Sequence, residues 1–308
     1  MKILITGGAG FIGSQVADKF IEKGHQVAII DNLSTGFKEN LNPKAKFYEV
    51  DLENAEDVRR AIAEFQPEVI DHHAAQVDVR KAVEDPVMDA KKNILGGLNL
   101  LQAALDQKVQ KFIYANSGGA GYGDPEELPC TEKSPIKPIS PYGVTKMCFE
   151  MYLHFAHVVH GLNFVSLRYP NVFGPRQTFG EAGVVAIFTH LMLKNEQPTI
   201  FGDGLSTRDY CFVGDIMAAN LLALENNQAA GAYNVGTGEE TSVNKVFEVI
   251  KSATNYQGEP IYADPRSGEI QRIVLDSTRL RSELGWSPSV TFEEGITETI
   301  KWHKSHKL

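Results

Sequence analysis

The chain has 308 residues, of which 43% are hydrophobic and 22% charged, and its formal net charge is −9. This length supports one large α/β unit with an appended lobe, and the acidic charge argues against nucleic-acid binding, which needs a basic face. Cys130, Cys148 and Cys211 are too few for a disulfide framework and lack metal-ligand spacing, so we expect no metal and a reducing compartment. The apolar start Met1–Thr6 is too short for a signal peptide or a membrane span. We therefore expect a soluble, cytoplasmic protein without a membrane partner.

The first half of the chain alternates short apolar runs with helical patterns. The apolar runs predict strands at Lys2–Thr6, Gln26–Ile30, Lys46–Val50, Val69–His72, Lys111–Ala115 and Asn163–Tyr169. The patterns between them predict helices at Gly13–Lys23, Asn54–Phe65, Val87–Gln107 and Pro141–His160. Such alternation gives right-handed crossovers, so we expect an α/β fold with a doubly wound parallel sheet of Rossmann type.

After Tyr169 the alternation breaks up, which indicates a smaller and discontinuous lobe. The predicted elements are a loop at Pro170–Arg176, a helix at Gly183–Lys194, a strand at Thr199–Phe201, a strand end and helix over Phe212–Glu225, a strand at Tyr233–Val235 that returns to the main sheet, a helix near Val243–Ala253, a strand near Pro260–Ala263 and a final helix from Phe292. We expect a Rossmann domain of residues 1–169 plus about 210–236, and a substrate-binding α/β lobe of about 170–209 plus 237–308.

A glycine-rich turn joins the first predicted strand to the first helix. Its glycines allow tight dihedrals and let the backbone approach a pyrophosphate. The following helix start offers unpaired N–H groups and the positive end of the helix dipole. The turn therefore predicts a dinucleotide site. Its candidate cofactor-binding residues are Gly7, Gly10, Phe11, Ile12 and Gly13.

Asp31 follows the second predicted strand, about 20 residues after the glycines, where a carboxylate accepts bonds from the adenosine ribose. The same carboxylate would repel a 2′-phosphate, so NAD is favoured over NADP. Further cofactor candidates lie where a doubly wound sheet would touch adenine and its ribose, although turn and packing roles explain several of them nearly as well. These candidates are Asn32, Asp51, Leu52, Ala74, Ala75 and Gln76.

Tyr142 and Lys146 stand four residues apart at a predicted helix start, and this spacing places them on one face. A tyrosine with a pKa of about 10 is a poor base at neutral pH, and a nearby ammonium group favours its phenolate. Lys146 can also donate to the nicotinamide ribose. The spacing alone also occurs by chance on amphipathic helices, and we interpret Tyr122 and Tyr152 as packing residues.

Together with the glycine turn and Asp31, several motifs resemble the extended short-chain dehydrogenase/reductase superfamily: His73-Ala74-Ala75, Asn93, the stretch 116–123, and Tyr142 with Lys146. More closely, the chain resembles the UDP-glucose 4-epimerases and related nucleotide-sugar epimerases from Met1 to about Trp302. The resemblance implies NAD-dependent 4-epimerisation of a UDP-hexose, either UDP-glucose and UDP-galactose or their N-acetyl forms. Tyr142 would be the base and Lys146 would lower its pKa, while hydride leaves C4 for NAD and returns to the other face. Asn93 joins the cofactor candidates.

The stretch after the fifth strand departs from the family's pattern. Many relatives read Ser-Ser-x-x-Val-Tyr-Gly, with a hydroxyl that binds the sugar 4-oxygen, whereas this chain reads Ser-Gly-Gly-Ala-Gly-Tyr-Gly from Ser117. Gly118 and Ala120 stand where hydroxyl residues are usual, and Ser117 falls one place earlier. Two interpretations stay open. Either Ser117 takes the catalytic role, or it caps the strand end while Tyr142 works alone or through water.

The resemblance also assigns residues of the second lobe. Arg208 and Arg266 match the diphosphate-binding arginines, and a guanidinium fork suits phosphate oxygens, although each can also be read as a solvated arginine in a polar loop. Other assignments are the diphosphate for Asn171, the nucleotide ribose for Glu269, and uracil for Gly183, Val184, Val185 and Phe201. Pro170 stands where relatives often have Ala or Phe. Ile273 replaces a bulky tyrosine of some relatives, so we expect room for an N-acetyl group.

Other functions are weighed against this one. A nucleotide-sugar 4,6-dehydratase needs an Asp-Glu pair after the fifth strand, and a uronate decarboxylase needs an acidic residue there, whereas the chain has Gly118–Gly121. An epimerase that acts on a uronate or another nucleotide sugar stays open. A non-catalytic NAD-sensing protein would commonly lose the Tyr–Lys pair, which is intact.

Two long predicted helices, Val87–Gln107 and Pro141–His160, carry apolar faces. On the second helix the face contains Phe149, Tyr152, Phe155 and Val159. The resemblance implies that the helices pair across a two-fold axis to form a four-helix contact, and therefore a homodimer. Packing against the subunit's own sheet would account for part of each face.

Overall fold

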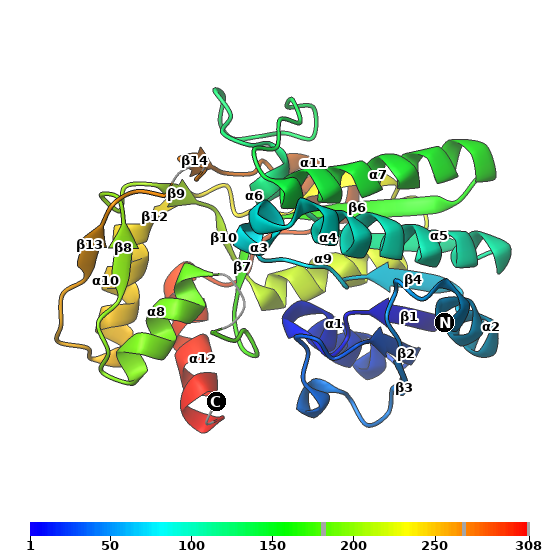
Figure 1. The fold of residues 1–308 in the computed structure, drawn as a ribbon, viewed down its shortest axis with the longest axis horizontal. Helices are drawn as coiled ribbons and strands as arrows, with labels where there is room; N and C mark the ends of the chain where they lie inside the picture. Colours follow the sequence, from blue (N-terminus) through cyan, green and yellow to red (C-terminus); the bar gives the residue numbers. More distant parts are fainter. Residues whose placement is uncertain (180–182, 267–268, 307–308) are drawn as a thin grey trace.

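The computed structural model describes residues 1–179, 183–266 and 269–306. Its centre is a seven-stranded sheet of strand order β11-β6-β5-β4-β1-β2-β3, in which every pairing is parallel (Figure 1). The strands are β1 (Lys2–Thr6), β2 (Gln26–Asp31), β3 (Lys46–Glu49), β4 (Val69–His72), β5 (Lys111–Ser117), β6 (Asn163–Tyr169) and β11 (Gly231–Asn234). The predicted doubly wound fold is confirmed. The direction of winding reverses between β1 and β4, which is where ligands bind in such sheets.

Helices cover both faces of this sheet. They are α1 (Phe11–Glu22), α2 (Ala55–Phe65), α3 (Val79–Glu84), α4 (Pro86–Ala90), the π-helical turn η2 (Lys91–Leu95), α5 (Gly96–Asp106), α7 (Pro141–His160) and α9 (Val213–Glu225), with short turns η1 (Lys38–Asn40) and α6 (Gly118–Gly121) between them. The predicted helix Val87–Gln107 is therefore not uniform. It is α-helical at both ends and widens to a π turn in the middle, a feature often found at functional sites.

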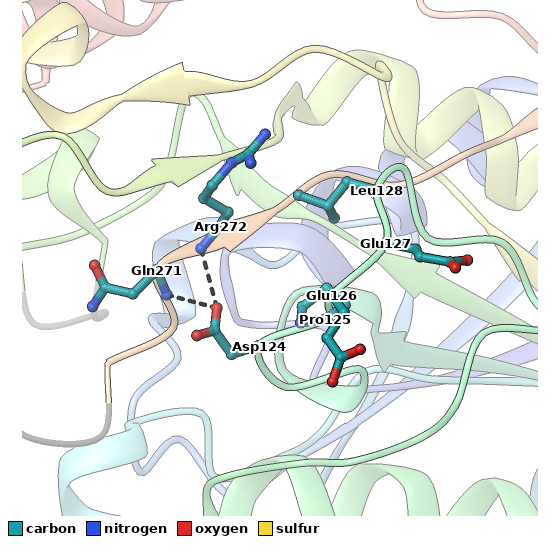
Figure 2. A pocket seen from close by; sticks show the side chains of 7 residues that line it. All are labelled: Asp124, Pro125, Glu126, Glu127, Leu128, Gln271 and Arg272. Carbon is teal, nitrogen blue, oxygen red and sulfur yellow. Dashed lines mark hydrogen bonds between the residues drawn. The ribbon is translucent and has the colours of Figure 1, made fainter.

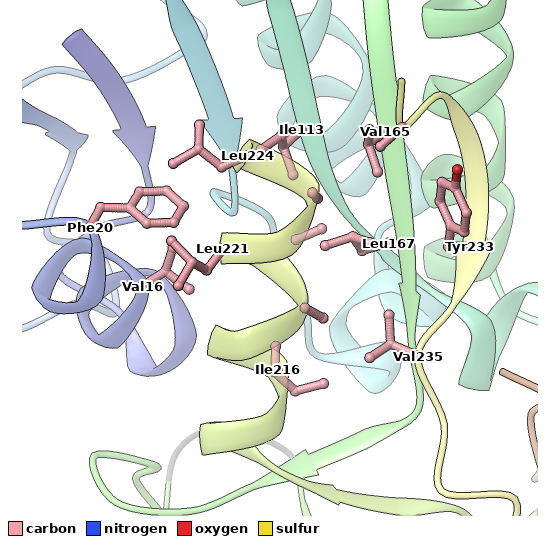
Figure 3. Packing of buried hydrophobic residues seen from close by; sticks show 14 of the residues in the cluster. Val16, Phe20, Ile113, Val165, Leu167, Ile216, Leu221, Leu224, Tyr233 and Val235 are labelled. Carbon is pink, nitrogen blue, oxygen red and sulfur yellow. The ribbon is translucent and has the colours of Figure 1, made fainter. Parts of the chain in front are cut away.

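The sheet is buried between two hydrophobic cores. On one face α1 and α9 pack against the strands, with Val16 and Phe20 of α1 meeting Leu221 and Leu224 of α9 (Figure 3). The other core joins α2, α5 and α7 to the opposite face. Each fully buried aliphatic or Phe side chain contributes about 1.5–3 kcal/mol. This burial explains why most of the strands read as apolar runs, whereas the edge strand β3 is partly exposed.

The rest of the chain forms small sheets and further helices, which lie mostly at the left of Figure 1. These elements are β7 (Asn171–Phe173), α8 (Val184–Leu193), β8 (Thr199–Phe201), β9 (Thr207–Arg208), β10 (Tyr210–Phe212), β12 (Thr241–Ser242), α10 (Val243–Thr254), β13 (Ile261–Ala263), β14 (Arg272–Ile273), α11 (Thr278–Leu284) and α12 (Phe292–Ser305). The pairings are β7 with β10, β8 with β13, and β9 with both β12 and β14.

Two expectations for this half have clear outcomes. The prediction of a loop at Pro170–Arg176 is wrong, because Asn171–Phe173 pairs in parallel with Tyr210–Phe212. Three residues are too few to show a strand period. The predicted return to the main sheet is confirmed, since Gly231–Asn234 pairs with β6. The division into two lobes stays a prediction. Among the described residues, no helix is both long and apolar enough to cross a membrane.

Candidate active site

The glycine turn brings the end of β1 and the start of α1 into close contact. Gly7 has a φ of +70°, and a Cβ there would lie 2.6 Å from the backbone nitrogen of Ala74. A Cβ on Gly13 would lie 2.4 Å from the Gly7 carbonyl oxygen. Gly10 caps α1 without a side-chain hydrogen bond, so no side chain of the described residues caps the first N–H groups of the helix. This leaves the donors that a pyrophosphate needs.

Asp31 binds the glycine turn from the end of β2. It is 9% exposed, and its Oδ2 accepts a hydrogen bond from the Ala9 N–H at 3.0 Å. Its Oδ1 accepts one from the Leu33 N–H at 2.8 Å. Each carboxylate oxygen has capacity for a second donor. Asp31 therefore fixes the turn and can still accept ribose hydroxyls.

The other cofactor candidates gather at the same edge of the sheet. Asn32 donates to Asp51 across the ends of β2 and β3, with Nδ2 2.8 Å from Oδ2. Ala74, Ala75 and Gln76 follow β4 and are partly exposed. Leu52, by contrast, has a side chain that packs in a hydrophobic core, and its contact to the cofactor stays a prediction.

Tyr142 and Lys146 lie in the first turns of α7, where local sequence fixes the helix start. The Ser140 hydroxyl caps the helix by accepting from the Gly143 N–H at 3.2 Å, and Pro141 occupies the first helical position. The helix ends at Gly161, which has a φ of +71°. The predicted helix is confirmed at both ends, so the two side chains lie on one face.

Burial shifts the two residues in opposite directions. It raises the pKa of Tyr142 to about 12, and the Asp89 carboxylate adds to the rise, while a hydrogen bond with Ser117 opposes it. Burial lowers the pKa of Lys146 to about 7, and Asp89 opposes this fall. The Lys146 ammonium nitrogen also lies 4.4 Å from the centre of the Tyr114 ring. The protein therefore holds a protonated phenol beside an amine that titrates near neutrality.

Ser117 lies beside Tyr142 although it stands one place early in the sequence. Strand β5 runs two residues further than predicted, to Ser117 itself, and the short helix α6 follows. The Ser117 hydroxyl accepts from the Ala120 N–H at 3.2 Å and interacts with the Tyr142 phenol. The two interpretations of Ser117 are thus compatible, because one hydroxyl both caps α6 and reaches Tyr142.

Several predicted substrate residues converge on one another from separate segments. The Arg266 guanidinium carbon lies 3.6 Å from the centre of the Phe201 ring. Arg266 also pairs with Glu269, with N and O atoms 3.8 Å apart. The sequence between these two residues includes 267–268, outside the described residues. An arginine stacked on an aromatic ring is pre-positioned for an anion and a planar base.

Arg208 lies on β9, close to this group. Its Nη1 donates to the Thr207 carbonyl at 2.8 Å. Burial lowers its pKa, against the effects of Tyr210, Glu269 and Asp124. The next residue, Asp209, is 1% exposed and accepts from the Thr237 N–H and hydroxyl and the N–H groups of Gly238 and Leu275. This buried carboxylate holds together the segments that surround Arg208.

Asn171 is placed near Ser117. Its N–H donates to the Asp209 carbonyl at 2.9 Å, and its Oδ1 would lie 3.5 Å from a Cβ built on Gly119. A larger residue than glycine at position 119 would therefore fill the space between the predicted catalytic and diphosphate-binding residues.

Two candidates of the second half have buried side chains. Gly183 and Val184 lie at the start of α8, but Val185 is 2% exposed and packs in a core with Phe188 and Phe247. Ile273 is 1% exposed and packs against Tyr122, Cys130 and Leu275. The side chains of such a buried cluster set the shape of a pocket wall but are not themselves exposed.

A cavity of about 720 Å³ lies beside the predicted substrate residues. It is lined by Asp124, Pro125, Glu126, Glu127, Leu128, Gln271 and Arg272 (Figure 2). The Asp124 carboxylate accepts from the N–H groups of Gln271 at 3.0 Å and Arg272 at 3.3 Å. Asp124 therefore ties the loop after α6 to β14. The wall is acidic, because Arg272 is already paired with Glu240.

Comparisons with known proteins agree with this geometry. The model of the NAD dependent epimerase/dehydratase family matches residues 3–236. A UDP-glucose 4-epimerase of Mycolicibacterium smegmatis is 41% identical over 311 residues, which cover 99% of each chain. The chain belongs to the NAD dependent epimerase/dehydratase family.

Two crystal structures from this family have the same fold. The UDP-glucose 4-epimerase of Thermotoga maritima with UDP-glucose has a TM-score of 0.96 and 47% identity. That of Thermus thermophilus in complex with NAD has a TM-score of 0.94 and 44% identity. Each comparison covers 99% of both chains. The resemblance to nucleotide-sugar epimerases is confirmed: the chain is an NAD-dependent enzyme of this class.

NAD is the cofactor of this epimerase-family chain, as the sequence predicts, and the residues present fit it. The glycine turn forms a cradle that a Cβ at Gly7 or Gly13 would fill, and uncapped N–H groups point out of α1. The buried Asp31 with the exposed Asn32, and the partly exposed Ala74–Ala75 segment, flank the cradle at the switch point. Their individual contacts to NAD stay predictions.

Sequence reasoning missed one element of this family member's site. Asn93, predicted as a cofactor contact, is 3% exposed. Its side chain bonds to Gln76, Thr145 and the buried Asp89, and its contact to NAD stays a prediction. Asp89 and Asn93 are four residues apart on one helical face, which is the same spacing as that of Tyr142 and Lys146. This spacing is the sequence signal that could have pointed to Asp89.

Proposed function

We propose that the chain interconverts the C4 epimers of a neutral UDP-hexose, UDP-glucose and UDP-galactose, with NAD as a resident cofactor. The observation that carries this proposal is the grouping of Ser117, Tyr142 and Lys146 beside the edge where the glycine turn lies. The Tyr142–Lys146 pair, which a redox step at a secondary alcohol requires, is therefore intact. The family's UDP-glucose epimerases support the choice of substrate.

Tyr142 exchanges a proton with the sugar 4-hydroxyl in this reaction. As a phenolate it accepts the proton while the C4–H bond breaks. When bound, NAD takes up that hydride and later returns it to the opposite face of C4. Tyr142 then gives the same proton back to the 4-oxygen, so the net change is inversion at C4.

The protein must lower the pKa of Tyr142 from about 12 for this step. The Ser117 hydroxyl already opposes the rise by donating to the phenolate, and we infer that the positive charge of the Lys146 ammonium lowers the pKa further. The cationic nicotinamide of NAD⁺ adds to this positive field. We infer that the phenolate forms in the complete complex.

The smaller lobe holds the UDP part. Arg208 and Arg266 bind the diphosphate, Asn171 assists them, and the ring of Phe201 packs on uracil. Glu269 accepts from the nucleotide ribose. The stacking of Arg266 on Phe201 at 3.6 Å supports this, because it places a guanidinium group for the phosphates next to an aromatic ring for the base. We infer that the residues about 170–209 plus 237–308 work as this substrate lobe.

The sugar is a hexose without a carboxyl group in this proposal. Asp124, Glu126 and Glu127 line the cavity beside Arg208, and their charge would repel a uronate. Ile273, packed in the wall with Tyr122 and Leu275, leaves more room than tyrosine. We therefore infer activity on UDP-N-acetylglucosamine as well as on UDP-glucose.

One assay tests the reaction and the sugar together. Purified enzyme with UDP-glucose, UDP-N-acetylglucosamine or UDP-glucuronate is analysed by chromatography of the sugar products. We expect conversion of the first two and at least about a hundredfold slower reaction of the third. Tyr142→Phe should lose at least about a hundredfold in kcat, within the usual contribution of a general base. Absence of any C4 epimer would overturn the proposal.

The size of residue 273 can be tested separately. Ile273→Tyr should lower the rate on the N-acetyl sugar relative to UDP-glucose by about tenfold, because the larger ring enters the wall of the pocket. Ile273→Val is the matched control and should keep the wild-type ratio. Unchanged relative rates in Ile273→Tyr would contradict the role of this residue.

We also propose that the enzyme is a homodimer through α7 and the α4–α5 helix. The outer face of α7 exposes a row of apolar side chains, each 39–67% exposed: Met151, Tyr152, Phe155, Val158 and Val159. Val87 and Leu95 of the neighbouring helix are similarly exposed. An apolar patch of this kind typically marks an interface. Its occupant is a second copy, because two copies of the pair make a four-helix contact.

The oligomeric state tests this interface. In light scattering after size exclusion the wild type should have twice the 34.0 kDa mass of the chain. Phe155→Glu combined with Val158→Glu should elute as a monomer with a folded circular dichroism spectrum. A monomeric wild type would contradict the proposed interface.

A further inference from the structure

Asp89 is a buried carboxylate that the proposed reaction does not use. It lies in α4 and is 0% exposed. Its oxygens accept from Thr145 Oγ1 at 2.7 Å, Gln76 Nε2 at 2.9 Å and Asn93 Nδ2 at 3.1 Å. A buried charge is costly unless it is hydrogen-bonded or paired. Three donors are therefore devoted to keeping this one carboxylate in place.

The donors to Asp89 come from both parts of the site. Thr145 stands between Tyr142 and Lys146 on α7. Gln76 ends the segment after β4 that is predicted to face NAD. Asn93, in the π turn, accepts from the Gln76 N–H at 2.8 Å and donates to the Gln76 carbonyl at 3.1 Å. Asp89 is thus the point at which the cofactor-facing loop is fastened to the catalytic helix.

The charge of Asp89 also acts on Lys146. The Lys146 amine lies 4.4 Å from the centre of the Tyr114 ring on β5. It interacts electrostatically with His72 on β4 and with Asp89 on α4, and Tyr142 stands one turn earlier on the same helix. Burial lowers the pKa of His72 well below its ordinary value, so that ring is neutral. Asp89 is the charged group that raises the pKa of Lys146.

We propose that Asp89 is a positioning residue for the catalytic pair, whose carboxylate supplies the negative charge behind Lys146 and fastens the loop at Gln76 to helix α7. Its charge favours the ammonium form of Lys146. The proposal rests on the roles of Tyr142 and Lys146 in the proposed function.

Asp89→Asn removes the charge with little change of shape. The Thr145 hydroxyl can turn to donate to the Tyr142 carbonyl, 3.0 Å away, and accept from the new amide, so the hydrogen bonds can be kept. Since Asp89 raises the pKa of both Tyr142 and Lys146, its loss lowers both. We expect the pH profile of kcat for UDP-glucose to move toward acid by about one pH unit, with KM changed less than about twofold.

The second readout does not depend on turnover. Phenolate absorbance of the NAD-loaded protein is titrated against Tyr142→Phe as the blank, and the Asp89→Asn phenolate should form about one pH unit lower. Asp89→Ser, which leaves room for water, makes the same prediction if the first variant does not fold. Titrations that coincide with the wild type would overturn the proposal.

Asp215→Asn is the matched control. Asp215 is 2% exposed and accepts from the Ser289 N–H at 3.0 Å and its hydroxyl at 2.6 Å. Its loss should lower the melting temperature and leave both titrations unmoved. A shift of the pH profile or of the phenolate titration in Asp215→Asn would mean that the loss of any buried carboxylate has this effect. Failure of the proposed function is recognised separately. If that function is wrong, Tyr142→Phe keeps its activity, and the phenolate titration still tests the role of Asp89.

Discussion

The Ser117 hydroxyl makes two interactions, one with the Ala120 N–H and one with the Tyr142 phenol. The first fixes the hydroxyl at the start of α6, and the second opposes the rise in the pKa of Tyr142. A side chain that caps a helix has little freedom, so the hydroxyl is already oriented before a sugar binds. The glycines that follow Ser117 favour this arrangement, because they let helix α6 begin directly after Ser117.

Ser117→Ala should lower kcat by about tenfold to a hundredfold, because a hydrogen bond to a charged group contributes about 1.5–3 kcal/mol. The phenolate of Tyr142 should also form at higher pH, since the lost hydrogen bond lowered its pKa. Steady-state kinetics and phenolate absorbance measure the two effects.

Ser242→Ala controls for the lost cap. The Ser242 hydroxyl accepts from the Lys245 N–H at the same 3.2 Å, but at the start of α10. This variant should lose a similar amount of stability and keep the wild-type pH profile. Equal kinetics for Ser117→Ala and the wild type would leave Ser117 with the capping role alone.

At the scale of elements, the contact between α1 and β1 decides whether a dinucleotide fits. The helix approaches so closely that the Gly13 Cα faces the Gly7 carbonyl directly, and Asp31 holds the intervening Ala9 N–H. A side chain at either glycine would displace the helix start from the sheet. The uncapped N–H groups of α1 would then no longer lie at the sheet edge.

Gly13→Ala should weaken NAD binding by at least about tenfold, or about 1.4 kcal/mol, and lower the melting temperature, because its Cβ would lie 2.4 Å from a carbonyl oxygen. Equilibrium dialysis of NAD and thermal unfolding measure this. Gly119→Ala is the control for folding, since its Cβ would meet its nearest atom at an ordinary 3.5 Å, and it should melt with the wild type. Normal NAD affinity in Gly13→Ala would contradict the close-contact argument.

At the scale of the whole molecule, the sequence predicts the sheet well because its strands are buried on both faces and read as apolar runs. It fails where tertiary contacts override local pattern: β7 is only three residues long, and the π turn is hidden in a helical period. For the candidate site, Tyr142 and the glycine turn are local motifs and could be found. Asp89 could not be assigned a role, because its partners come from three segments of the chain.

Stability should fall as the pH falls below about 6.5. Burial lowers the pKa of His303 to about 4, and burial also lowers the pKa of His190. The unfolded chain titrates near 6.5, so between the two values it binds protons that the folded protein does not, and protonation favours unfolding. Above pH 6.5 this stability is fully present.

Melting temperatures measured from pH 7 to pH 5 check this expectation. The wild type should lose stability over that range, and His303→Gln should lose less. His160→Gln, at an exposed position of α7, should follow the wild type. A melting temperature that stays constant from pH 7 to pH 5 would contradict the assignment of His303 and His190 as neutral, partly buried histidines.

The position of β11 has a consequence for how the chain folds during synthesis. This strand covers β6, yet it follows β6 by some sixty residues of sequence. Until Gly231–Asn234 has left the ribosome, the β6 backbone on that side has no partner, and an unpaired strand edge invites pairing with another chain. Asn234 also accepts from Tyr122 at 2.7 Å. A nascent or truncated chain that ends after Tyr169 is therefore complete in its NAD motifs and still prone to aggregate.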